Sequence, residues 1–277
     1  MVYKQDWSRF ALALGLALSV SAWSLAQNIS LSPPPLGGRP VMSSPMTAAA
    51  GTAAAGTGQP VTGQPVTGQL KLGPQEGAAH PSGCGRTATG GGNITVSQPA
   101  PDTIVVRMTG NVAACGNLLK GADAALNFCE NLQFCVEFSQ PGHTGQLMME
   151  TKLVGSMAAK GCHATVGVTQ AATTISCESA PVLNLSMPPR SVGGSVGINS
   201  VQGPVCAPVC GGIYSLNQVF RIFASDTQGA ICGRAIGEFS PSPLAATWLG
   251  PSYPFASADK SAYGYQVTLR LVPEPSN

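Results

Sequence analysis

Charged side chains are scarce in this chain of 277 residues, because Asp, Glu, Lys and Arg together make up only 9% of it. An ordinary soluble domain contains roughly 25%. The formal net charge is +2, so neither nucleic-acid binding nor binding to anionic membranes has electrostatic support. Hydrophobic residues make up 44% of the chain, which is too many for a disordered protein. We therefore expect a folded protein whose surface is covered by uncharged polar side chains.

Histidine is also scarce, with three residues in the whole chain: His80, His143 and His163. A serine or cysteine hydrolase needs a histidine that a carboxylate orients, and His143 with Glu150 or Asp226 offers such a pair. The sequence has no Gly-x-Ser-x-Gly elbow, no phosphate-binding loop and no dinucleotide fingerprint. It therefore predicts no cofactor and favours a protein that is not an enzyme. The alternative is a secreted hydrolase with a site near His143 or His163.

Long apolar runs are missing as well. The most apolar run covers residues 10–22, whereas a membrane-spanning helix needs about 20 residues. It follows Lys4 and Arg9 and precedes Ser24-Leu25-Ala26, whose small residues suit a signal peptidase. We expect residues 1–26 to be an export signal that is cleaved after Ala26, with an uncleaved anchor as the alternative. The mature chain is then secreted or held in the cell envelope, without a membrane span.

Cysteine is absent from the first 83 residues and from the last 45. The nine cysteines are Cys84, Cys115, Cys129, Cys135, Cys162, Cys177, Cys206, Cys210 and Cys232. An exported chain meets an oxidising environment, so we expect disulfides, and an odd number leaves at least one thiol over. Spacing along the sequence suggests three local bridges: Cys162–Cys177, Cys206–Cys210 and Cys129–Cys135.

A metal site is the rival interpretation of these side chains. The weak candidates for ligands are His143, Met148, Cys162, His163, Cys206 and Cys210. Cys206-x3-Cys210 together with Cys162-His163 offers zinc ligands, although zinc thiolate sites usually combine paired short motifs. Met148, Met149 and Met157 with His143 and His163 would suit Cu(I), but methionine is also a common core filler. Disulfides and core packing are therefore favoured over zinc and copper.

Residues 27–83 have the composition of a flexible tether. They contain three successive prolines at 33–35, an Ala/Gly/Thr run at 48–58, and the pentapeptide Gln-Pro-Val-Thr-Gly at 59–63 and again at 64–68. Such a segment has little to bury, and so few copies cannot build a repeat fold. The sequence predicts a disordered linker rich in Pro, Gly, Ala and Thr.

Residues 84–277 predict an all-β domain, an antiparallel β-sandwich or a barrel-like fold reinforced by disulfides. Short runs that alternate apolar and polar residues are separated by Gly and Pro turns, as in strands that are buried on one face. The predicted strands cover residues 93–97, 102–108, 132–138, 146–154, 164–169, 173–177, 182–186, 218–224, 230–236 and 263–271. We expect a short helix at 117–126, and the Gly/Pro-rich segment 187–212 suggests a long loop, with a possible sub-boundary near 188–204.

Together these patterns predict an exported structural or binding module of a cell envelope or extracellular matrix. Its partner would be an envelope or extracellular component that the sequence does not specify, and self-association through a leftover thiol or a strand edge is a further possibility. Trp248, Tyr253 and Phe255 could form a contact patch or a hydrophobic lid.

Overall fold

A computed structural model describes residues 65–85, 87–116, 121–161, 163–227, 233–241 and 259–274. All of them belong to one compact unit, Pro60–Asn277. The predicted export signal and most of the predicted linker lie outside the described residues. Within the described ranges, no helix combines the length and the apolar character that a membrane crossing requires.

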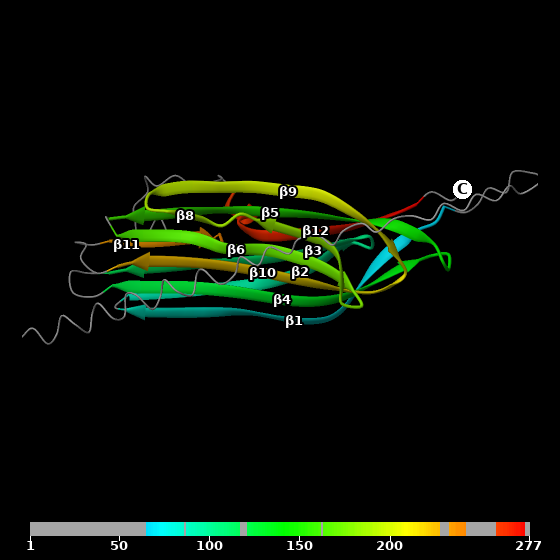
Figure 1. The fold of residues 1–277 in the computed structure, drawn as a ribbon, viewed down its shortest axis with the longest axis horizontal. Coiled ribbons are helices and arrows are strands. Elements are labelled where there is room, and N and C mark those ends of the chain that lie inside the picture. Colours follow the sequence, from blue (N-terminus) through cyan, green and yellow to red (C-terminus); the bar gives the residue numbers. More distant parts are fainter. Residues whose placement is uncertain are drawn as a thin grey trace, which may run out of the picture. The chain divides into compact units, whose positions relative to one another are not determined.

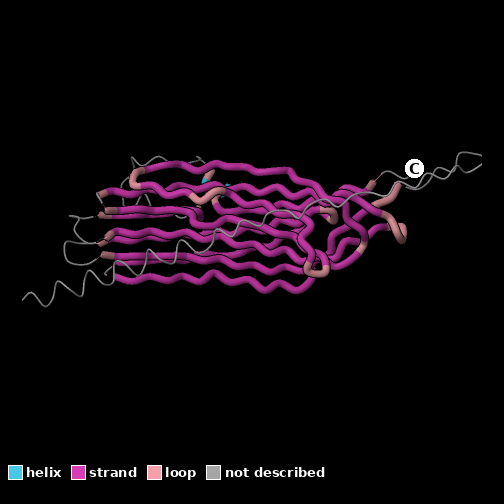
Figure 2. The backbone as a smooth tube through the Cα atoms, in the orientation of Figure 1, coloured by secondary structure: helices cyan, strands magenta, loops and turns pink. Residues whose placement is uncertain are grey.

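The described residues form an all-β structure of two antiparallel sheets that pack face to face as a sandwich (Figure 1). The strands are β1 (Gly68–Gly85), β2 (Thr87–Ala100), β3 (Thr103–Cys115), β4 (Ala122–Phe138), β5 (Thr144–Lys160), β6 (Ala164–Cys177), β7 (Ala180–Met187), β8 (Arg190–Val192), β9 (Ser195–Cys210), β10 (Gly212–Asp226), β11 (Arg234–Phe239) and β12 (Gly264–Pro273). A single helical turn, η2 (Lys260–Ala262), precedes β12. Figure 2 shows that strands account for nearly all of the described chain.

The first sheet, called sheet A, has the strand order β1-β4-β10-β6-β7, and β8 also pairs with β6. In the second sheet, called sheet B, β2 pairs with β3 at one edge and β9 pairs with β5 at the other. Between β3 and β5 the centre of sheet B is shared by two strands, because β11 pairs with one half of each neighbour and β12 with the other half. The predicted closing strand, now β12, is therefore central, and the chain leaves the sheet after Phe239 and returns at Gly264.

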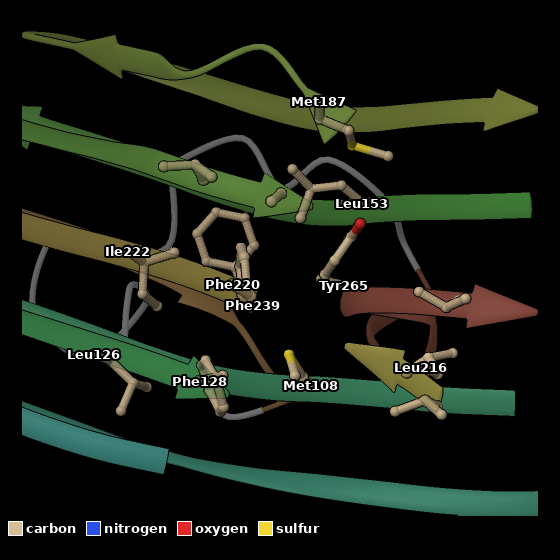
Figure 3. Packing of buried hydrophobic residues seen from close by; sticks show 14 of the residues in the cluster. Met108, Leu126, Phe128, Leu153, Met187, Leu216, Phe220, Ile222, Phe239 and Tyr265 are labelled. Carbon is tan, nitrogen blue, oxygen red and sulfur yellow. The ribbon is translucent and has the colours of Figure 1, made fainter. Parts of the chain in front are cut away.

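Strict alternation of inner and outer side chains explains why these segments are strands. In β4 the buried Leu132, Phe134 and Val136 alternate with less buried neighbours, and β12 does the same with Val267 and Leu269. Phe128, Phe220, Phe239 and Tyr265 fill the middle of the core from both sheets (Figure 3). The predicted all-β fold and the predicted inner faces are confirmed.

Three predictions about local structure were wrong. Residues 68–83, which were placed in the linker, belong to β1. An edge strand needs little apolar surface, and of the β1 side chains whose exposure the structure describes, residues 68–83, only Leu70 is buried. The predicted helix at 117–126 overlaps β4, where Ala122, Ala124 and Leu126 alternate with more exposed residues. The segment 187–212 is not a long loop, because it contains β8 and β9, which pair with β6 and β5.

The two local disulfides that the structure can test are also wrong. Cys129 and Cys135 both lie on β4, and Cys206 and Cys210 both lie on β9. At about 3.3 Å per residue, the members of each pair are at least about 13 Å apart, whereas bridged cysteines need Cα atoms within about 7 Å. The six cysteines whose side chains are described are all free thiols. Cys162, the predicted partner of Cys177, lies outside the described residues, as does Cys232.

Proline occurs in the edge strands of both sheets and is nearly absent from the central ones. The edge strands β1, β2, β7 and β9 contain Pro74, Pro81, Pro99, Pro181, Pro204 and Pro208. Among the central strands, only β12 has a proline, Pro273, and it is the final residue of that strand. Because proline lacks a backbone N–H, it interrupts the template that an open edge offers to another chain.

Replacing Pro208 by valine is therefore expected to convert the monomeric fraction into dimers or larger species as concentration rises. Valine restores an N–H and a β-branched side chain on the exposed edge strand β9. Sedimentation velocity over a concentration series measures the change. Asn217→Val is the matched control, because it adds valine to the exposed face of the central strand β10, whose neighbours already pair on both sides. Equal association of the two variants would assign the effect to apolar surface instead of the edge.

Candidate functional site: an aromatic pocket on the outer face of sheet A

The outer face of sheet A carries a pocket near the end of β10, with a volume of about 350 Å³. Strands β1, β4 and β10 contribute its lining, which includes Ser82, Gly83, Asp123, Ala125, Phe223 and Ser225. We call it the Phe223 pocket. Register explains why these residues meet: Phe223 is the cross-strand partner of Ala125, which is also the partner of Ser82 on its other side.

Small neighbours leave room for the ring of Phe223. On the β6 side its cross-strand partner is Gly167, and a Cβ added to that glycine would lie 2.5 Å from Cε1 of Phe223. The ring therefore packs on the bare backbone of β6, and the partner on the other side is the short side chain of Ala125. A half-buried aromatic ring with a carboxylate and two serine hydroxyls nearby is the usual composition of a small polar-ligand pocket.

Polar side chains also lie further along the same face of sheet A. One row that crosses the sheet consists of Glu76, Asn131, Asn217, Thr174 and Asn184, which the register places side by side, and all of them except Glu76 are uncharged. The hydroxyl of Thr174 donates to Oδ1 of Asn184 over 3.5 Å. This face offers many amide and hydroxyl groups, as the composition predicted.

A second pocket, of about 380 Å³, lies beside the turn between β4 and β5. Cys135, Glu137, Phe138 and His143 are among its lining residues. Nε2 of His143 lies 2.8 Å from the carbonyl oxygen of Glu274, and since a carbonyl can only accept, Nε2 carries the hydrogen. The imidazole also packs edge-on against Phe138. His143 thus ties the end of the chain's last strand to this turn.

The structure does not bring together the predicted hydrolase pairs. Glu150 follows His143 along β5, so the two residues are about 20 Å apart, and Glu150 pairs with Thr268 on the neighbouring strand. Asp226 lies at the opposite end of the sandwich, next to Ala122 and Ala164. His163 is exposed at that end, where its carbonyl oxygen accepts the backbone N–H of Thr227. The predicted orientation of His143 by Glu150 or Asp226 is therefore wrong.

The predicted metal ligands are scattered as well. Met149 and Met157 are buried core residues, whereas Met148 faces outward beside Cys206. His143 and His163 flank the 17-residue strand β5 at its two ends, about 55 Å apart. Among the described residues, no group of three or more His, Cys, Asp or Glu side chains is placed to hold a metal ion. Cys162 lies outside the described residues.

Asp226 is buried at the end of β10, where its carboxylate lies beside the residue that follows β3 and the residue that precedes β11. Its Oδ2 accepts the backbone N–H of Gly116 over 2.7 Å. A Cβ on Gly233 would lie 2.0 Å from Oδ1, so that glycine leaves space for the carboxylate. Asp226 thus holds the end of β10 against the segment that follows β3.

A polar layer crosses the core between the two sheets. Gln218 lies between Glu130 and Thr173 on adjacent strands of sheet A, and all three are buried. The hydroxyls of Thr173 and Tyr265 are 2.9 Å apart and link the layer to sheet B. Burial raises the pKa of Tyr265 to about 12, while the nearby hydroxyls of Thr173 and Thr151 oppose the rise.

Glu130 lies where this layer approaches the edge strand β1. Its carboxylate occupies space that a Cβ on Gly77 would fill. Neither carboxylate oxygen has a hydrogen bond of good geometry, so the nearby amide of Gln75 compensates only in part. Burial therefore raises the pKa of Glu130 above its ordinary value.

On the outer face of sheet B, a polar cluster anchors the chain where it re-enters the sheet before β12. The guanidinium of Arg107 donates to Oε1 of Gln266 and to the carbonyl oxygen of Ser261. Hydrogen bonds from Ser261, with smaller contributions from Arg107 and Lys152, lower the pKa of Asp259. The predicted contact residues Trp248, Tyr253 and Phe255 precede this cluster and lie outside the described residues.

Sequence reasoning missed the Phe223 pocket, although the sequence contains a signal for it. Phe220, Ile222 and Ala224 point to the buried face of β10, and Phe223 points to its outer face. A large aromatic residue on the outer face of a strand is a candidate for binding. The lining residues from β1 and β4 carry no such signal, because only the pairing of strands brings them beside Phe223.

Comparisons with known proteins give little help. No family model matches the sequence, and no curated protein matches it. Among solved structures, the Family 11 Carbohydrate-Binding Module from Clostridium thermocellum, in complex with a beta-1,3-1,4-mixed-linked tetrasaccharide, is similar at 11% sequence identity, and the alignment covers 61% of this chain and 92% of that one. The TM-score is 0.14. A likeness this weak says nothing about the ligand or activity of this chain.

Proposed function

We propose that this protein is an exported binding module of the cell envelope or extracellular matrix, and that its sandwich binds a neutral, polyhydroxylated polymer such as a polysaccharide at the Phe223 pocket. The half-buried ring of Phe223 in an open pocket beside Asp123 and two serines is the observation that carries the proposal. The export signal and the linker predicted from the sequence would place such a module outside the cytoplasm.

The chemistry of the pocket suits a sugar. The C–H groups of a pyranose ring pack on an aromatic face, whose negative π surface attracts their partial positive charge. The carboxylate of Asp123 accepts hydrogen bonds from sugar hydroxyls, and the hydroxyls of Ser82 and Ser225 both donate and accept. The amide and hydroxyl side chains further along the outer face of sheet A would meet more distant sugar units of a long polymer.

The low charge of the chain favours a neutral ligand over an ionic one. A net charge of +2 provides no strong field to attract a polyanion, and specificity would depend on hydrogen bonds and packing. Binding should therefore be nearly independent of ionic strength, because no ion pairs are required.

Replacing Phe223 by alanine is expected to weaken polymer binding roughly tenfold or more, since an aromatic anchor in a pocket contributes about 2 kcal/mol. The mature chain recovered from the culture medium or the cell envelope would be incubated with insoluble cellulose, chitin, mixed-linkage β-glucan, mannan and peptidoglycan, and the bound fraction measured. Phe223→Tyr should retain binding.

Val219→Ala is the matched control, because Val219 lies on the same outer face of β10, four residues away. It should bind as the unsubstituted chain does. If the unsubstituted chain binds none of these polymers, or if Phe223→Ala binds as well as Val219→Ala does, the proposed ligand class is wrong.

A further inference from the structure

Glu130 places a carboxylate in the core directly against the edge strand β1. It lies on the inner face of β4, in line with the buried Phe128 and Leu132, and only 3% of it is exposed. Its cross-strand partner on β1 is Gly77, and a Cβ added to that glycine would overlap the carboxylate. The carboxylate therefore occupies the space that the missing side chain of Gly77 leaves beside the backbone of the edge strand.

The surroundings of this carboxylate suit its protonated form. On the β1 side, the amide of Gln75 compensates for burial only in part. On the other side, Gln218 of β10 is the cross-strand partner of Glu130, and its amide atoms have no hydrogen bond of good geometry. An ionised carboxylate can only accept hydrogen bonds, whereas a protonated one can also donate to the amide oxygen of Gln218.

The strands packed around Glu130 supply no charge that would offset its ionisation. The inner faces of β1, β2 and β3 carry no titratable side chain among the described residues, and Glu76 on β1 faces outward. On β10 the inner-facing titratable residues are Tyr214 and Asp226, four residues before and eight residues after the partner of Glu130. The polar layer also contains Tyr265 of sheet B, which a pKa of about 12 keeps uncharged.

The strand that covers the carboxylate has few side-chain contacts to hold it. Of residues 68–83 in β1, only Leu70 is buried, so residues 73–83 are joined to β4 mainly by backbone hydrogen bonds. Pro74 and Pro81 lie within this segment and have no N–H to donate. An edge segment with so few buried contacts opens locally at a small cost in free energy.

We propose that Glu130 is a pH-sensitive switch for the edge strand: when protonated it keeps residues 73–83 of β1 on β4, and when ionised it favours their release. Opening of this segment lets water reach the carboxylate and removes the cost of burying its charge. The segment includes Ser82 and Gly83, so its release would also remove one wall of the Phe223 pocket. That consequence rests on the proposed function, whereas the switch itself does not.

The raised pKa of Glu130 gives the sign of the effect. The closed strand holds the proton more tightly than the open one, in which the carboxyl returns to its ordinary pKa of 4.5. As the pH rises from 4.5 to the pKa of the closed state, the opening equilibrium constant should increase by up to about tenfold per pH unit, and then level off. The segment is therefore closed in acid and opens more often at neutral pH.

Hydrogen exchange of the mature full-length chain, measured by mass spectrometry between about pH 4.5 and 8, tests the switch. Dividing each rate by the intrinsic exchange rate at that pH gives the opening constant. Peptides that cover residues 73–83 should show a larger opening constant than peptides from the central strand β10, and this constant should rise with pH. A constant that does not rise would overturn the proposal. So would one equal to that of β10 at every pH, because β1 would then open only when the whole chain unfolds.

Two variants identify the titrating group. Glu130→Gln should keep the opening constant of residues 73–83 at its acid value at every pH, because an amide cannot ionise. Glu137→Gln is the matched control, since Glu137 lies on the outer face of the same strand and its lowered pKa leaves it ionised over this range. It should retain the full rise with pH. If the opening constant of Glu130→Gln rises as that of Glu137→Gln does, another group titrates and the proposal is wrong.

Discussion

Replacing Phe220 by alanine is expected to lower the free energy of unfolding by about 4 kcal/mol. Phe220 is fully buried on the middle strand of sheet A. Its ring centroid lies 5.6 Å from that of Phe128, 5.3 Å from that of Phe239 and 5.6 Å from that of Tyr265. Alanine therefore removes contacts with both sheets at once. The hydrogen-bonded strands on either side cannot close the resulting cavity, so the loss exceeds the simple transfer energy of the ring.

Phe223→Ala is the matched control for this experiment. The substitution is the same and lies on the same strand, but Phe223 points to the outer face and is half-buried. It should lower the free energy of unfolding by about 1 kcal/mol. Urea unfolding followed by circular dichroism measures both variants. Equal losses would show that the ring cluster of Phe220 does not hold the two sheets together.

The second large effect is an increase in stability. Glu130→Gln is expected to raise the free energy of unfolding at pH 7 by about 1–2 kcal/mol, because it removes a buried negative charge that lacks hydrogen bonds of good geometry. The uncharged amide has nearly the same shape, so it should fit over Gly77 as the carboxylate does. Urea unfolding at a series of pH values measures the difference.

The sign of the pH dependence follows from the raised pKa of Glu130. Below the ordinary value of 4.5, the carboxyl is protonated in both the folded and the unfolded chain, and it imposes no penalty. As the pH rises through 4.5, the unfolded chain releases this proton first, so stability falls until the pH passes the folded pKa. The gain from Glu130→Gln should therefore be absent in acid and complete at neutral pH.

Glu137→Gln provides a control of the opposite sign on the same strand. Hydrogen bonds from Lys71 and Gln69 lower the pKa of the exposed Glu137. Its contribution to stability is present at neutral pH and is lost as the pH falls through the folded pKa, so Glu137→Gln should reduce stability slightly at pH 7. If both variants shift stability in the same direction at pH 7, burial is not what governs Glu130.

Much of the fold could be predicted from the alternation of apolar and polar residues. That alternation places Leu132, Phe134 and Val136 on one face of a strand, and Val267 and Leu269 on one face of another. In the structure both sets lie on the inner faces of their sheets. The pattern failed where a strand had little to bury. β1 has the composition of a linker, and it can still form a strand because backbone hydrogen bonds to β4 stabilise it at the sheet edge. It also failed at Ala122–Leu126, where alanine suits a helix and pairing with β10 overrides that preference.

Less of the candidate site could be predicted from the sequence. Phe223 could have been found because it alternates with the buried residues of its strand, but Ser82 and Asp123 are 141 and 100 positions away from it in sequence. The cysteines show the same limit, since spacing along the chain favoured the pairs Cys129–Cys135 and Cys206–Cys210, and the members of each pair lie on one strand. On one strand, four residues span about 13 Å, which is too far for a disulfide.

The sequence by itself determined that this chain is poor in charge and built from strands. These properties are local, because composition and the two faces of a strand depend only on residues next to one another. The tertiary structure alone decided that β11 and β12 share the centre of sheet B, that a pocket forms around Phe223, and that the hydroxyl of Tyr214 binds the carbonyl oxygen of Cys210. Each of these depends on which strands pair and in which register, and that choice is made by the packing of the whole core.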